Sequence, residues 1–118
     1  MKYETLPHTE LKVSKICLGT MTFGEQNSEI EVHQQLNFAF ENGVNFIDTA
    51  EMYPVPPDVK YVGVTEEIVG RWMKTKDRDA IILASKVAGP SHGWITAPLR
   101  GCKTGLDRHH IVRAVEAS

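Results

Sequence analysis

Three ionisable side chains stand at, or just after, the ends of two apolar stretches of the chain. Residues 44–48 (VNFID) end in Asp48, and Tyr53 follows five positions later. Residues 80–86 (AIILASK) end in Lys86. A free phenol has a pKa of about 10, so a tyrosine exchanges protons efficiently at neutral pH only when a nearby ammonium favours its phenolate form. These residue types predict a proton-transfer set in which Tyr53 is the acid or base, Lys86 tunes it and Asp48 orients the lysine.

The spacing places Asp48 and Lys86 at the same edge of a sheet. Side chains alternate between the two faces of a strand, so each of these residues ends an otherwise apolar face of its own stretch. In α/β folds the carboxyl ends of parallel strands carry the functional sites. Simpler interpretations stay open at this point. Asp48 could cap a turn, Lys86 could be a solvated strand end, and Tyr53 could pack within its proline-rich loop.

The elements that would position these residues alternate between strands and helices. Residues 2–14 read as a β-hairpin, and residues 15–19, 44–48 and 80–86 read as short apolar strands. Helical patterns begin near residues 28, 65 and 107. The order hairpin, β, α, β, α, β, α predicts an α/β fold with a parallel sheet.

Each helix has a residue suited to cap its amino end. Ser28 with Glu31 three positions later forms a capping-box pattern, and Thr65 and Asp107 are the expected caps of the other two helices. Apolar spacing also predicts which side chains are buried. These are Trp72 on the second helix, Cys17 in the first strand, and one face of the last helix with Ile111, Ala114 and Val115.

Composition argues against several classes of partner. The formal net charge is −2 and the sequence pI is about 6.2, which gives no electrostatic reason to expect nucleic acid or an anionic membrane as a partner. No apolar run approaches the roughly 20 residues of a membrane span, and the first residues do not resemble a signal peptide. The two cysteines are far apart, and the five histidines lack metal-ligand spacing. We therefore expect a cytoplasmic protein without a metal site.

Four motifs in series resemble the aldo-keto reductase family. They are LGTMTFG (residues 18–24), FIDTAEMY (46–53), TEEIVG (65–70) and ASKV (84–87). The resemblance covers nearly the whole chain in the right order, hairpin included. The form AEMYPVPP of the second motif is most similar to the bacterial Tas-type members of the family.

The resemblance implies a (β/α)8 TIM barrel that uses NADPH to reduce small-molecule carbonyl substrates to alcohols. It assigns catalysis to Tyr53, Lys86 and Asp48. The resemblance does not decide between NADPH and NADH, and it does not identify the natural carbonyl substrate. Cofactor contacts near the nicotinamide ribose would come from Gly19, Thr20, Met21 and Asp48.

The chain is expected to hold only part of that barrel. Residues 1–118 correspond to the hairpin and the first three βα units, cut within the third helix. The family's histidine at the end of the fourth strand has no counterpart, with His92 as a weak substitute, and the late loops that bind the cofactor are missing. We therefore expect a fragment that is inactive alone. Trp94 could contact substrate or simply pack. The alternative function is a non-catalytic binding module or auxiliary subunit of the same fold.

Overall fold

The computed structural model describes residues 1–90, 99–102 and 104–118, and its elements follow the predicted order. His92 and Trp94 lie outside the described residues. The elements are β1 (Tyr3–Thr5), β2 (Lys12–Ser14), β3 (Cys17–Gly19), α1 (Glu29–Glu41), β4 (Phe46–Asp48), α2 (Val64–Met73), the 3-10 helix η1 (Arg78–Ala80), β5 (Ile82–Ala84), the 3-10 helix η2 (Leu99–Cys102) and α3 (Arg108–Ala117).

Two separate sheets form in this part of the chain. Strands β1 and β2 make the predicted antiparallel hairpin, and β3, β4 and β5 make a parallel sheet in that order. The register sets Gly19 beside Asp48 and Asp48 beside Ala84. The parallel sheet is therefore confirmed, although each strand is shorter than its apolar run and Lys86 lies two residues beyond β5.

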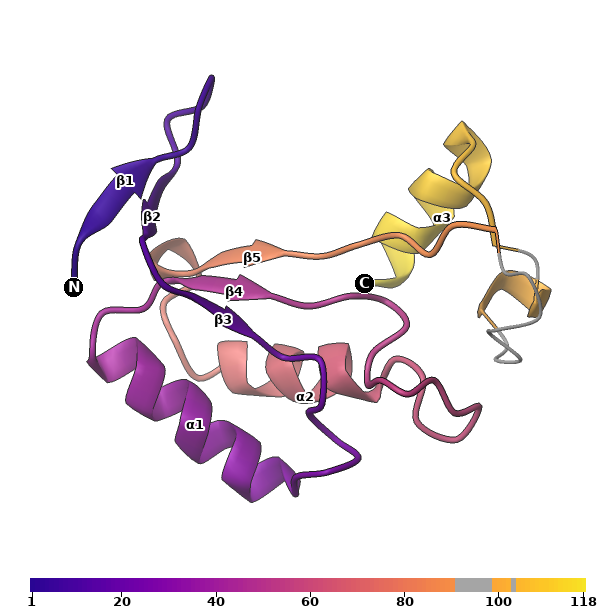
Figure 1. Cartoon of the computed structure of the whole chain (residues 1–118), viewed down its shortest axis with the longest axis horizontal. Coiled ribbons are helices and arrows are strands. Elements are labelled where there is room, and N and C mark those ends of the chain that lie inside the picture. The colour runs from indigo at the N-terminus through magenta and orange to yellow at the C-terminus, as the bar shows by residue number, and fades with distance from the viewer. Residues whose placement is uncertain (91–98, 103) are drawn as a thin grey trace.

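Helices α1 and α2 cover one face of the parallel sheet, while the hairpin lies near its amino end and α3 beyond its carboxyl end (Figure 1). The main hydrophobic core fills the space between the sheet and the two helices. Trp72 is its largest fully buried side chain, as predicted, and its ring packs edge-on against Phe40 with centroids 5.9 Å apart. The indole N–H donates to Asn37 at 2.9 Å, so this polar atom is satisfied. The buried core residues are Phe23, Val32, Leu36, Ile47, Ile68, Val69, Trp72, Met73 and Ile81.

The amino ends of the helices confirm two predicted caps and correct the third. Ser28 and Glu31 form the capping box of α1, and the Asp107 carboxylate accepts from two N–H groups of α3. Thr65 was wrongly predicted as the cap of α2, which starts after Gly63 in a left-handed conformation (φ +84°). Thr65 lies buried in the first turn and donates its hydroxyl to the carbonyl of Phe23 at 2.6 Å, a partner 42 residues away.

Two burial predictions were also wrong. Cys17 is exposed, because its neighbour Leu18 packs against the core beneath the helices, which places Cys17 on the opposite face of the sheet. No described element covers that face in Figure 1. On α3 only Ala114 is buried, whereas Ile111 and Val115 are exposed, because α3 lies beyond the end of the sheet rather than on a face of it. None of the helices in the described part of the chain is long and apolar enough to cross a membrane.

Candidate active site

The structure brings Asp48, Tyr53 and Lys86 together at the carboxyl end of the parallel sheet. The ammonium Nζ of Lys86 lies 2.6 Å from Oδ2 of Asp48 and 3.1 Å from the phenol oxygen of Tyr53. It also donates to the carbonyl oxygen of Thr49 at 2.9 Å. An ammonium has three N–H donors, so all three are used at once. The predicted juxtaposition is therefore present, with the lysine at its centre.

Main-chain geometry explains how Tyr53 and Asp48, which are 33 and 38 positions from Lys86 in the sequence, come into contact with it. The β4–β5 ladder continues past the strands, with Thr49 N–H bonded to Ala84 O at 2.9 Å. The chain then turns, because Tyr53 N–H bonds to Ala50 O at 3.0 Å. This turn returns the phenol toward the sheet edge, where Lys86 Nζ is 4.8 Å from the centre of the ring. The pair is partly solvated, since the Asp48 and Lys86 side chains are 33% and 49% exposed.

The charge on Lys86 is favoured by its neighbours. Burial alone would lower the pKa of the ammonium, but hydrogen bonds and charge from Asp48 and Tyr53 outweigh burial, so the Lys86 pKa lies above its ordinary value. The same charges reach Cys17 on the open sheet face. Burial and the Asp48 carboxylate raise the pKa of the Cys17 thiol, against the opposing effect of Lys86.

The four predicted cofactor contacts lie side by side but differ in exposure. Gly19 is exposed, and a side chain built there would meet nothing within 4 Å, so open space lies above the main chain beside Asp48. Met21 is exposed as well, and its carbonyl accepts from Val55 N–H at 2.8 Å. Thr20 is fully buried, and both its N–H and its hydroxyl donate to Asp48 O, at 3.1 and 2.9 Å. Open space therefore lies beside the Asp48 residue at Gly19, and Thr20 holds the adjoining main chain in place.

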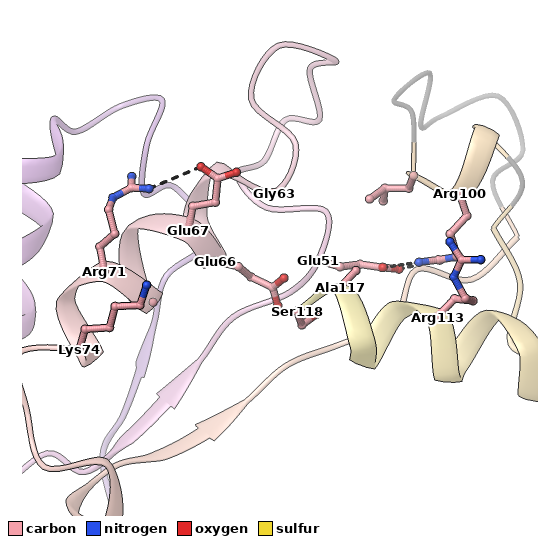
Figure 2. Close-up of a pocket in the computed structure, with 12 residues that line it drawn as sticks. Glu51, Gly63, Glu66, Glu67, Arg71, Lys74, Arg100, Arg113, Ala117 and Ser118 are labelled. Carbon is pink, nitrogen blue, oxygen red and sulfur yellow. Dashed lines mark hydrogen bonds and ion pairs between the residues drawn. The ribbon is translucent and has the colours of Figure 1, made fainter.

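A buried ion pair that sequence reasoning missed lies beside this site. Glu51, between Asp48 and Tyr53 in the chain, bonds to Arg100 of η2 through both oxygens, one of them 2.8 Å from Nη2. The acid inside the motif TAEMY was the available signal in the sequence, but its partner is 49 residues away. The pair borders a cleft of about 700 Å³ between α2 and the carboxyl-terminal segment, and none of Asp48, Tyr53 and Lys86 lines this cleft (Figure 2).

Comparison with known proteins identifies the family. The Aldo/keto reductase family model matches residues 15–118, so the chain belongs to that family. Protein tas from Escherichia coli (strain K12) is 55% identical over 92 residues, which cover 77% of this chain and 27% of that protein. The uncharacterized oxidoreductase YrpG from Bacillus subtilis (strain 168) is 37% identical over 122 residues, covering 100% of this chain and 35% of that protein. The similarity to Tas-type members is confirmed.

Solved structures confirm the fold class. The holo form of aldo-keto reductase AKR11C1 from Bacillus halodurans superposes with a TM-score of 0.75 at 28% identity, covering 98% of this chain and 34% of that chain. The thermostable aldo-keto reductase Tm1743 has a TM-score of 0.71 at 28% identity, with 98% and 36% covered. The fold is therefore a partial (β/α)8 barrel, and its parallel sheet is not closed within the residues that the structure describes. The chain spans about a third or less of the curated relatives reported above.

Proposed function

We propose that this chain carries the proton-transfer side of an NADPH-dependent reductase site that converts aldehydes and ketones to alcohols. The observation that carries the proposal is a single ammonium, Lys86 Nζ, bonded at once to the Asp48 carboxylate and the Tyr53 phenol. A carboxylate and a main-chain carbonyl fix the ammonium, and its third donor is aimed at the Tyr53 phenol, which can give a proton to an oxygen.

Each residue has one role in the proposed reaction. Tyr53 donates its phenolic proton to the carbonyl oxygen of the substrate. The phenolate that remains is stabilised by the Lys86 ammonium 3.1 Å away, and Asp48 keeps that ammonium charged and aligned. In the reverse direction Tyr53 takes the proton of the alcohol.

The cofactor would supply the hydride, and the surface beside Asp48 fits it. The nicotinamide end would lie over the exposed main chain of Gly19 and Met21, with Asp48 nearby. Thr20 would act by holding this turn through its two bonds to Asp48 O. The cytoplasmic location expected from the two widely separated cysteines belongs to the same proposal.

We further propose that these 118 residues do not turn over alone. The support is the open sheet: three strands are paired, and Cys17 and Gly19 lie exposed on the face that carries the site. Water that reaches Asp48 and Lys86 freely weakens their electrostatic effect on a reacting group. A non-catalytic binding module of the same fold would have no need of the Lys86 contacts, so loss of the phenol separates the two functions.

A chimera provides the test. Residues 1–118 would replace the matching segment of E. coli Tas, and NADPH and NADH oxidation would be followed with a panel of aldehydes and ketones. We expect Tyr53→Phe to lower kcat by about 10²-fold or more, the usual contribution of a positioned acid. Tyr61→Phe, in the same loop, is the matched control and should leave kcat unchanged. An active chimera with an unchanged Tyr53→Phe rate would refute the role of the phenol.

A further inference from the structure

The two chain segments that carry the proton-transfer residues are joined by one buried ion pair. Glu51 belongs to the segment after β4, and Arg100 belongs to η2, in the segment that follows β5. The Glu51 and Arg100 side chains are only 6% and 12% exposed, against 33% and 49% for the Asp48–Lys86 pair. Figure 2 shows the carboxylate and the guanidinium in direct contact at the border of the cleft.

Glu51 also forms two hydrogen bonds with the main chain at the point where the regular sheet ladder ends. The Glu51 N–H donates to the carbonyl of Lys86 at 3.2 Å. Two residues further along, the N–H of Ala88 donates to Oε1 of Glu51 at 2.6 Å. Glu51 therefore holds the main chain at two points, the Lys86 carbonyl through its own backbone and the Ala88 N–H through its side chain.

The Glu51–Arg100 pair differs from an ordinary surface ion pair because both of its charged side chains are buried. A buried carboxylate is unfavourable unless a charge and hydrogen bonds compensate it. Arg100 also adopts a left-handed conformation (φ +49°), which residues other than glycine rarely do. The Glu51 carboxylate raises the pKa of the Arg100 guanidinium, against the effect of burial, so the guanidinium stays charged.

We propose that Glu51, supported by Arg100, is a positioning residue for the proton transfer described above, on which this inference rests. Glu51 holds the main chain from Lys86 to Ala88 where Nζ can reach both Asp48 and Tyr53. Without the carboxylate, the segment after β5 loses the bond from Ala88 N–H and is held to Glu51 only by the main-chain bond at Lys86. The lysine then leaves its three acceptors for water.

The test follows the titration of Lys86 by NMR in the 118-residue chain labelled at lysine Cε. Lys86→Arg identifies the signal by its disappearance. In the unmodified chain we expect Lys86 to titrate above ordinary lysines, whose pKa is about 10.4. In Glu51→Gln we expect its pKa to fall to that ordinary range. Glu29→Gln is the matched control, because it removes a bidentate pair to Arg71, with bonds of 2.7 and 3.0 Å, that lies between α1 and α2. The control should leave the Lys86 titration unchanged.

A second variant covers the case in which Glu51→Gln fails to fold. Glu51→Leu/Arg100→Met replaces both charges with apolar side chains, which removes the buried unpaired guanidinium and also the acceptor of the Ala88 N–H. Folding is checked by far-UV circular dichroism. A folded variant of either kind with an unchanged Lys86 titration overturns the proposal, and so does unfolding of both, since the pair would then serve the fold as a whole.

This experiment does not depend on turnover, so it separates the two proposals. If Glu51→Gln shifts the Lys86 pKa but Tyr53→Phe leaves the kcat of the chimera unchanged, the positioning role of Glu51 is supported and the reductase role of Tyr53 is refuted. A titration that does not respond, together with a Tyr53-dependent chimera, would refute only the positioning.

Discussion

Two carboxylates three residues apart should differ sharply in what they contribute to stability. Asp48 is part of a partly solvated pair with Lys86 at 2.6 Å, and Glu51 is part of a buried pair with Arg100. Exposed pairs contribute about 0–1 kcal/mol, because water screens them. Removal of one partner of a buried pair costs about 3–5 kcal/mol, because the other charge stays buried without compensation. Asp48→Asn should therefore lower the free energy of unfolding by about 1 kcal/mol or less, and Glu51→Gln by about 3 kcal/mol.

Urea unfolding followed by far-UV circular dichroism measures both changes. With a slope of about 1.5 kcal/mol/M for a chain of this size, Glu51→Gln should lower the midpoint by about 2 M, and Asp48→Asn by well under 1 M. Glu51→Leu/Arg100→Met should recover most of the loss, since no buried charge remains. Equal losses for the two single variants would refute the reasoning, because burial would then not decide the strength of the pairs.

Two further predictions concern pH and local helix structure. Because the Lys86 pKa is raised on folding, its contribution to stability is complete below the unfolded pKa of about 10.4 and is lost as pH rises through the folded value. The stability difference between the unmodified chain and Lys86→Gln, measured from about pH 9 to about pH 11.5, should therefore shrink with rising pH; a constant difference would contradict the raised pKa. Ser28→Ala should cost about 1 kcal/mol and Ser28→Gly only a few tenths, since glycine is tolerated at the cap position. The same urea titrations would measure this difference, and equal costs would show that the capping box adds nothing.

Several features of this protein could be predicted from neighbours in the sequence. The capping box of α1 needs only Ser28 and Glu31, three positions apart, and the alternation of apolar residues determines which strand face each residue occupies. Parallel pairing then brings the ends of β4 and β5 together, so the proximity of Asp48 and Lys86 follows from parity and strand order. The motifs also identified the family.

Features that depend on distant partners could not be predicted in this way. Thr65 is a residue type that often caps helices. Here it lies inside the helix and donates its hydroxyl to the carbonyl of Phe23, because the first turn of α2 packs against the loop after β3. Cys17 is apolar in character but exposed, because burial depends on which elements cover each face of the sheet. The sequence contains no local signal that joins Glu51 to Arg100.

The sequence alone therefore determined the caps of α1 and α3, the strand faces, the family and the three residues proposed for proton transfer, since each rests on short-range spacing or motif identity. Only the tertiary structure decided how firmly those residues are held. The distances from Lys86 Nζ to its three acceptors, and the burial of Glu51 against Arg100, arise from packing between segments 33 to 49 residues apart. Electrostatic strength depends on distance and on exclusion of water, and neither quantity exists until the chain has folded.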